Sequence, residues 1–231
     1  IKYCKFFMEN IIHIFYIHAS DKISDNLFEK FLIQIPYSFQ QEIKNYKHWQ
    51  SAQSSLLGKI LLQYGFIQLH LKHTLSELKV SEKDRPFIND SIDFNISHSG
   101  EYIVCAITQQ ARVGIDIEMH RTLKQDIAKK YFNKNECIAI ENASDKTTAF
   151  FNFWVIKESA IKCDGRGMEI LSKTIIKNTE KTENNNNKIV ACGEQEYYFN
   201  LLPIVEKYSS AVCSNQPFRS IVSKVTLTDL E

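Results

Sequence analysis

The sequence is poor in glycine and proline, has no closely spaced cysteines and has no long apolar stretch. Its 231 residues include 7 glycines, 4 prolines and 6 cysteines, and the absence of any C-x-x-C pair argues against a zinc module. The longest run without Asp, Glu, Lys or Arg is the 12 residues Ile60–Leu71, whereas a membrane-spanning helix needs about 20 apolar residues. We therefore expect no transmembrane helix.

An excess of charge of either sign is also lacking. The 28 Lys+Arg residues against 27 Asp+Glu give a net charge of +1, which does not suggest a general affinity for nucleic acid or a membrane surface. The apolar N-terminal stretch carries Glu9, His13 and His18 without a following cleavage site, so no secretory signal is expected. With 44% hydrophobic and 24% charged residues, the composition predicts a globular, cytoplasmic protein.

Hydrophobic spacing in the first half of the chain predicts a strand, then helices, then several short strands. The strand covers 11–17, where β-branched and aromatic residues dominate. Apolar residues at helical spacing predict helices at 24–35 and 40–64, and Gly65 is a plausible helix stop. The short strands are expected at 77–81, 94–97, 102–108 and 113–118.

The second half repeats this order loosely, without sequence similarity at a fixed period. The expected helices are 123–131, 134–142 and 146–163, and the expected strands are 170–177, 188–191, 197–202, 209–213 and 220–227. Helices followed by strands, twice, predict an α+β fold of two similar lobes, each consisting of helices followed by a mostly antiparallel sheet.

The segment VGIDIE, Val113 to Glu118, alternates strictly between apolar residues and the set Gly114, Asp116 and Glu118. The two carboxylates therefore share one face of a strand, with their Cα atoms roughly 7 Å apart. Either this face is simply solvated, or the two like charges are neutralised by a cation or a base. Mg²⁺ binds through one or two carboxylates plus substrate phosphates, and Gly114 leaves space for such a group on the carboxylate face.

The segment FWVIKESAIK, Phe153 to Lys162, lies in a long amphipathic helix. Glu158 and Lys162 stand four residues apart, which is the spacing of an ordinary surface ion pair. Their stripe also contains Phe151 and Trp154, so a partly buried, functional pair is the alternative. In an earlier segment, YFNKNE, Asn133 and Glu136 have the spacing of a capping box.

The segment FNISHSG, Phe94 to Gly100, follows Arg85-Pro86 by a short loop. Ser97 and His98 supply polar donors that suit phosphate oxygens, although such residues are also common in ordinary turns. A serine–histidine hydrolase pair is disfavoured because neighbouring residues on a strand point to opposite faces, and the sequence has no G-x-S-x-G elbow.

In this order, the motifs Arg85-Pro86, FNISHSG, VGIDIE, YFNKNE and FWVIKESAIKCDGRGM closely resemble those of the Sfp-type 4'-phosphopantetheinyl transferases. The resemblance covers about residues 42–168. It implies a monomer of two lobes, 1–110 and 111–231, that binds coenzyme A in the cleft between them. It also implies transfer of the phosphopantetheine arm to a serine of a carrier protein, with release of 3',5'-ADP.

The resemblance also assigns roles to individual residues. Asp116, Glu118 and Glu158 would bind Mg²⁺. Glu158 would take the proton of the carrier serine, Lys162 would favour departure of the leaving group, and Glu136 would be an acid near the metal or a capping residue. The residues in contact with coenzyme A would be Ser55, Arg85, Pro86, Ser97, His98, Lys157 and Lys162.

This sequence departs from the family pattern at several positions. Arg85 stands where lysine is common, and Val155 stands where a small polar residue is usual. Basic residues that some members place before the first long helix are not apparent, because Phe39 and Glu42 lie near that position, although Lys44 and Lys47 are close. We therefore expect the 3'-phosphate of coenzyme A to be held in a different way.

Two other functions fit the same residues. One is a Mg²⁺-dependent phosphoester hydrolase that acts on a nucleotide, since it would use the same carboxylates. The other is a non-catalytic module that binds coenzyme A. The presence of both Glu158 and Lys162 favours the transferase over the binding module.

Overall fold

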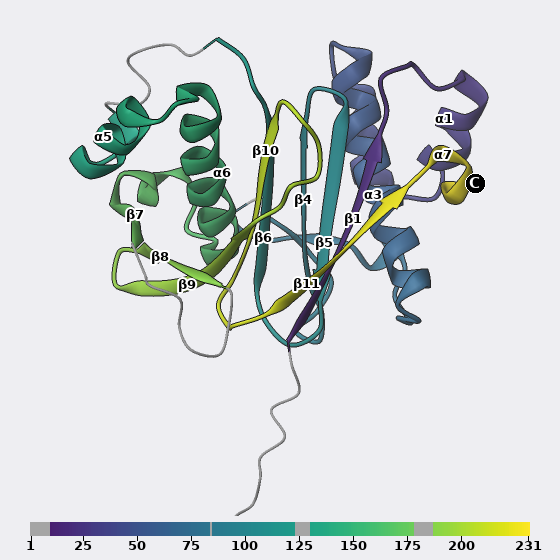
Figure 1. Cartoon of the computed structure of the whole chain (residues 1–231). Coiled ribbons are helices and arrows are strands. Elements are labelled where there is room, and N and C mark those ends of the chain that lie inside the picture. Colours follow the sequence, from purple (N-terminus) through teal and green to yellow (C-terminus); the bar gives the residue numbers. More distant parts are fainter. Residues whose placement is uncertain (1–9, 84, 123–129, 178–186) are drawn as a thin grey trace, which may run out of the picture.

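The computed structural model describes residues 10–83, 85–122, 130–177 and 187–231, and it contains both helices and sheets (Figure 1). The α+β class is confirmed. The helix expected at 123–131 lies mainly outside the described residues. The helices within the described residues are α1 (Asp25–Leu32), α2 (Tyr37–Lys44), α3 (Trp49–Gln68), α5 (Lys134–Asn142), α6 (Lys146–Asp164) and α7 (Leu227–Leu230), with the short 3-10 helices η1 (Leu75–Glu77) and η2 (Met168–Lys173).

The described strands form two main sheets and one short hairpin. The first sheet has the order β11 (Arg219–Val225), β1 (Ile11–His18), β5 (Tyr102–Thr108), β4 (Asp93–Ser99). The second has the order β6 (Val113–Met119), β10 (Tyr208–Ser214), β9 (Gln195–Leu201), β8 (Lys188–Cys192), β7 (Thr174–Lys177). The hairpin pairs β2 (Lys79–Val80) with β3 (Pro86–Phe87). Pairing is antiparallel except between β1 and β11, which run parallel.

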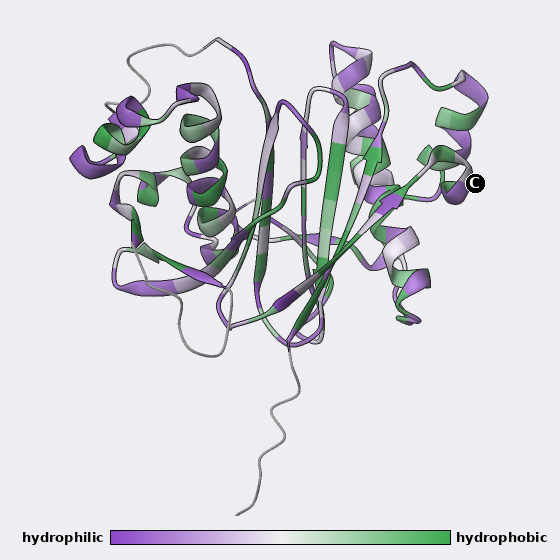
Figure 2. Cartoon of the chain, viewed as in Figure 1, coloured by the Kyte–Doolittle hydropathy of each residue, from purple (hydrophilic) through white to green (hydrophobic). Residues whose placement is uncertain are grey.

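The two main sheets lie in the middle of the molecule, with α1 and α3 on one flank and α5 and α6 on the other (Figure 1). Alternate residues of β1 and β5 pack against alternate residues of β6, so the sheets share one apolar core, which includes Ile12, Ile14, Val104, Val113, Ile115 and Ile117. Hydrophobic residues accordingly follow the central strands in Figure 2. The expected alternation of VGIDIE is confirmed, because its apolar face is the one that meets the first sheet.

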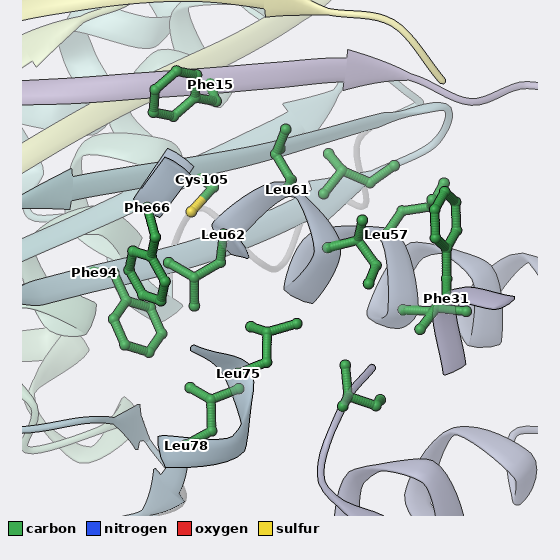
Figure 3. Close-up of a cluster of buried hydrophobic side chains, with 14 of the residues drawn as sticks. Phe15, Phe31, Leu57, Leu61, Leu62, Phe66, Leu75, Leu78, Phe94 and Cys105 are labelled. Atoms are coloured by element: carbon green, nitrogen blue, oxygen red, sulfur yellow. The ribbon is translucent and has the colours of Figure 1, made fainter. Parts of the chain in front are cut away.

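A second core fills the space between the first sheet and α3. Figure 3 shows the side chains of α3 among those of the sheet, of η1 and of Leu78, which follows η1. They are Leu57, Leu61, Leu62 and Phe66 with Phe15, Phe94, Cys105, Leu75 and Leu78. A third core lies between α6 and the second sheet. Within the described residues, no helix is both long and apolar enough to cross a membrane.

The helix expected at 40–64 is in fact two helices, because α2 ends at Lys44 and α3 begins at Trp49. Gly65 does not stop α3, which continues to Gln68. A Cβ at Gly65 would meet Ile107 and, at 3.0 Å, the ring of Phe15. The glycine therefore lets the helix approach the sheet closely, which is a packing role rather than a capping role.

The ends of two other predicted strands also differ. The segment predicted as a strand at 170–177 begins as the 3-10 helix η2 and becomes a strand only at Thr174. The strand predicted at 220–227 ends at Val225, and α7 follows it. This strand, β11, does not join the second sheet. It returns to the first sheet and pairs with β1.

Gly114 has a different role from the one expected from the sequence. It lies on the carboxylate face of β6, but that face is covered there by α6. An added Cβ would meet the carbonyl oxygen of Ser159 and, at 2.5 Å, the backbone nitrogen of Cys163. Gly114 therefore makes room for a helix backbone, not for a phosphate group.

We predict that Gly114→Ala lowers the free energy of unfolding by at least about 3 kcal/mol, because backbone atoms cannot move aside as a flexible side chain can. Gly193→Ala is the matched control. Gly193 has φ +63°, and the nearest atoms to an added Cβ are side-chain ends at 3.9 Å, so only backbone strain of about 1 kcal/mol is expected. Urea unfolding compares the two, and equal losses would show that α6 does not depend on Gly114.

Candidate active site

A row of polar side chains on β4 joins the two main sheets. The backbone N–H of Val113 donates to Oδ2 of Asp93 at 2.7 Å, and that of Ile115 donates to Oδ1 of Asn95 at 2.9 Å. Further along, the N–H of Met119 donates to Oγ of Ser99 at 3.1 Å. Residues two apart on a strand share a face, so the odd-numbered positions of β4 all reach β6. Side chains thus replace main-chain pairing along this seam.

Ser97 is the remaining position of this row, and it contacts a side chain instead of the backbone. Its hydroxyl donates to Oδ1 of Asp116 at 2.8 Å. The amine of Lys162 donates to the same oxygen at 2.6 Å, to Oγ of Ser97 at 3.0 Å and to the carbonyl of Ile115 at 3.2 Å. The side chain of Lys162 is 29% exposed, so its amine is accessible to a ligand as well as to Asp116.

One carboxylate oxygen of Asp116, Oδ2, is buried and has no hydrogen-bond partner among the described residues. Burial raises the pKa of this carboxyl, while the charge of Lys162 and the hydrogen bonds from Lys162 and Ser97 oppose the rise. A buried polar atom without a partner is costly, and this one is free to meet a group that the chain itself does not supply.

Two further carboxylates, Glu118 and Glu158, interact electrostatically with Asp116. Glu118 accepts hydrogen bonds from Ser99 and Arg121, both at 2.9 Å. Burial raises the pKa of Glu158 to about 7, with additional contributions from the negative charges of Asp116 and Glu118 and an opposing one from Lys162. In the described residues, no three His, Cys, Asp or Glu side chains already form a metal-binding group. The carboxylates are thus near one another without forming a closed cage.

A cation nevertheless suits this place. Oδ2 of Asp116 has no partner, and the carboxylates of Glu118 and Glu158 add negative charge nearby. Mg²⁺ takes oxygen ligands and usually needs only one or two carboxylates, with phosphate and water completing its shell. An open arrangement of this kind therefore fits a cation that binds together with a phosphate-bearing substrate.

Three residues predicted to contact coenzyme A line one pocket of about 170 Å³, namely Ser55, Pro86 and His98. Apolar side chains, among them Leu62 and Phe94, form the rest of its wall. Burial and the positive charges of Lys162 and Lys59 lower the pKa of His98. The imidazole is therefore neutral at pH 7, and it lies within the electrostatic reach of Lys162.

Arg85 is not part of this pocket, and its guanidinium is already occupied. It pairs with Asp93 at 2.7 Å, and it donates to the carbonyls of Val113 at 2.8 Å and Lys162 at 2.5 Å. It also lines a separate, larger pocket of about 690 Å³. Arg85 therefore ties β4, β6 and the end of α6 together.

Glu136 and Lys157 are also separate from the site of Asp116 and Lys162. They form a buried ion pair at 2.7 Å, and the side chain of Lys157 is only 1% exposed. Lys157 also donates to the carbonyl of Tyr131 at 2.9 Å, and Glu136 completes the capping box with Asn133. The capping interpretation of Glu136 is confirmed, and Lys157 is closed to any ligand in this structure.

Sequence reasoning missed Lys59 and the row on β4. Lys59 stands four residues after Ser55, so the two share a face of α3, and its amine donates to Oγ of Ser55 at 3.0 Å. This spacing was readable in the sequence. The alternation of polar residues in DFNISHS, Asp93 to Ser99, can also be seen in the sequence. It does not indicate, however, that these side chains contact β6.

We predict that Arg85→Gln lowers the free energy of unfolding by about 3 kcal/mol, because it leaves Asp93 partly buried without its counter-charge. Lys22→Gln is the control. The ion pair of Lys22 with Asp25 has side chains 56% and 88% exposed, and such pairs contribute less than about 1 kcal/mol. Urea titration at pH 7 measures both. Similar losses in the two variants would contradict the role assigned to Arg85.

We predict that Glu158→Gln stabilises the metal-free protein at pH 8 by about 3 kcal/mol. The pKa of this group rises from 4.5 to about 7 on folding, so the folded state holds more protons than the unfolded state between these pH values. Wild-type stability must therefore fall as the pH rises through this window, and the difference must vanish below about pH 4.5. Thermal unfolding in a chelator tests this, with the exposed Glu141→Gln as control. A difference that does not change with pH would contradict it.

Comparison with known proteins gives matches along nearly the whole chain. Residues 22–110 match the model of the 4'-phosphopantetheinyl transferase N-terminal family, and residues 112–213 match that of the 4'-phosphopantetheinyl transferase superfamily. The chain is 31% identical to the 4'-phosphopantetheinyl transferase gsp of Aneurinibacillus migulanus, over 96% of this chain and 92% of that protein. It is also 31% identical to the 4'-phosphopantetheinyl transferase Sfp of Bacillus subtilis (strain 168), over 68% and 72%. A mouse relative, the L-aminoadipate-semialdehyde dehydrogenase-phosphopantetheinyl transferase, is 28% identical over 56% of this chain and 48% of its own. The chain therefore belongs to the 4'-phosphopantetheinyl transferase superfamily.

Proposed function

We propose that this protein transfers the 4'-phosphopantetheine arm of coenzyme A to a serine hydroxyl of a carrier protein. The observation that carries the proposal is the meeting of Asp116, Ser97 and Lys162 at the seam between the two sheets, within a chain whose two halves both match transferase models. We further propose that residues 1–110 and 111–231 act as two lobes related by a pseudo-two-fold axis. In this proposal one chain supplies the whole site as a monomer, and β11 crosses back to the first lobe.

The reaction is a displacement at phosphorus. The serine oxygen forms a bond to the phosphorus that carries the pantetheine arm. The bond from that phosphorus to the bridging oxygen breaks, and its electron pair leaves with 3',5'-ADP. The serine proton passes to the carboxylate of Glu158, which lies near Asp116 and Lys162. Lys162 offers its partly exposed ammonium to the negative charge that develops on the departing phosphate.

Asp116, Glu118 and Glu158 are the residues that would hold Mg²⁺. The ion would supply electrophilic stabilisation of the phosphate oxygens. Ser97 is committed to Asp116, so in this proposal it orients that carboxylate. Ser55, Pro86 and His98 would contact coenzyme A in the pocket beside α3. We do not include Glu136, Lys157 or Arg85 among the residues that touch substrate, because other groups of the chain already occupy them.

The test is to mix the protein with an apo carrier protein, coenzyme A and Mg²⁺ and to measure the mass of the carrier. We predict a mass gain of one phosphopantetheine group, and a loss of rate of roughly 100-fold or more in Asp116→Ala, because removal of both carboxylate oxygens leaves Lys162 and the cation without their partner. Glu29→Gln, an exposed change on α1, is the matched control and should keep the wild-type rate.

Other outcomes would identify the alternatives. Release of 3',5'-ADP without any carrier modification would favour a hydrolase. Binding of coenzyme A without either product would favour a binding module. No mass gain on carriers of fatty acid, polyketide and peptide synthesis would contradict the transferase proposal.

A further inference from the structure

Lys59 is a buried lysine without an acidic partner. It lies on α3 (Figure 1) and is 9% exposed. Its amine donates to Oγ of Ser55 at 3.0 Å and to the carbonyl of the same residue at 3.4 Å, and it lies 5.1 Å from the centre of the Phe39 ring. It forms no ion pair with any described residue, whereas Lys157, the other buried lysine of the described residues, is paired with Glu136.

Such an arrangement is unfavourable for the folded protein alone. Removing an ammonium from water is costly unless an opposite charge compensates it. Burial accordingly lowers the pKa of Lys59, and the negative charge of Glu42 only partly opposes this. One neutral hydroxyl, one carbonyl and one aromatic ring do not replace a counter-ion. The missing negative charge is therefore expected to come from a ligand.

The surroundings of Lys59 point to the kind of ligand. Lys59 lines the same pocket as Ser54, Ser55 and His98, which add hydroxyl and imidazole groups to its ammonium. The pocket volume of about 170 Å³ is smaller than the roughly 300–1,000 Å³ of sites that enclose a whole ligand. It therefore fits one charged group of a larger molecule. A phosphate monoester is such a group, since it is dianionic and accepts several hydrogen bonds.

The pocket lies beside the reaction centre but is separate from it. His98 experiences the charges of both Lys59 and Lys162, whereas Lys162 itself is bonded to Asp116 on the opposite side of the seam. If coenzyme A is the substrate, its pyrophosphate must lie near Lys162, because it contains the reacting phosphorus. The other phosphate of coenzyme A, on the 3' position of its ribose, remains to be held nearby.

We propose that Lys59 is a specificity-determining residue that binds the 3'-phosphate of coenzyme A in this pocket, together with Ser55 and His98. The proposal rests on the proposed function, because it takes its ligand from that reaction. Lys59 reaches this position from inside α3 and lines the pocket, whereas Lys44 and Lys47, just before the helix, are exposed and do not line it. Since the 3'-phosphate does not react, Lys59 acts on the choice of substrate rather than on the chemical step.

The experiment compares ligands that differ only in the 3'-phosphate. Binding of adenosine 3',5'-bisphosphate and of adenosine 5'-monophosphate is measured by calorimetry for wild type, Lys59→Met and the exposed-lysine control Lys72→Met. In Lys59→Met we expect roughly 10- to 100-fold weaker binding of the bisphosphate and unchanged binding of the monophosphate. The transfer assay should show the same contrast in kcat/KM between coenzyme A and 3'-dephospho-coenzyme A. Lys72→Met should resemble wild type.

Thermal unfolding separates this role from a structural one. Methionine has a similar shape and no charge to desolvate, so Lys59→Met should raise the Tm of the ligand-free protein. A lysine that serves the fold would instead lower the Tm on replacement, and that result would overturn the proposal. Lys59→Arg, which keeps the positive charge, should retain at least part of the preference for the bisphosphate.

Two binding results would contradict the proposed role of Lys59 in binding the 3'-phosphate. Equal weakening of both nucleotides would assign Lys59 to the 5' side of the ligand, and unchanged binding of both would leave it without a ligand. Either result overturns the proposal. If wild type modifies no carrier but still prefers the bisphosphate in a Lys59-dependent way, the proposed transfer fails while the phosphate site stands, so the two failures are distinguishable.

Discussion

The structure depends on the seam where side chains of β4 satisfy the backbone of β6. Two sheets that meet edge to edge without main-chain pairing would leave N–H groups unsatisfied, and buried polar groups of this kind are costly. Asp93, Asn95 and Ser99 accept those hydrogen bonds. Because Ser97 occupies the remaining place in the row and contacts Asp116, the same device that joins the sheets also sets the position of the acidic site.

Helix α6 is positioned by this seam and carries both structural and chemical residues. Gly114 allows its backbone to approach β6 closely, and Arg85 binds the carbonyl of Lys162 near its end. With the helix fixed, Lys157 is directed into a buried pair with Glu136. Lys162 reaches Asp116 from the same helix and stays partly exposed. Neighbouring lysines therefore have different roles because they leave the helix in different directions.

The basic residues near the seam and the pocket fall into two groups. Arg85 and Lys157 each have a carboxylate within 2.7 Å, so their charge is used to hold the fold together. Lys162 shares its charge with Asp116 while remaining accessible, and Lys59 lacks an acidic partner in the described part of the chain. A net charge of +1 is thus compatible with an anionic substrate, since the positive charges of Lys59 and Lys162 both act on His98 at one pocket.

The sequence by itself determined the local elements and the family. The alternation of VGIDIE, the course of α6 and the capping box of Glu136 depend on neighbours a few residues away, so periodicity and spacing were enough to find them. Only the tertiary structure decided what Arg85, Gly114, Lys157 and Lys59 do. Their roles depend on groups that folding brings together, such as Arg85 with the carbonyl of Lys162, 77 residues away. A motif indicates the residue types that a reaction needs. Burial and the nearest opposite charge then determine which of these residues can contact a substrate.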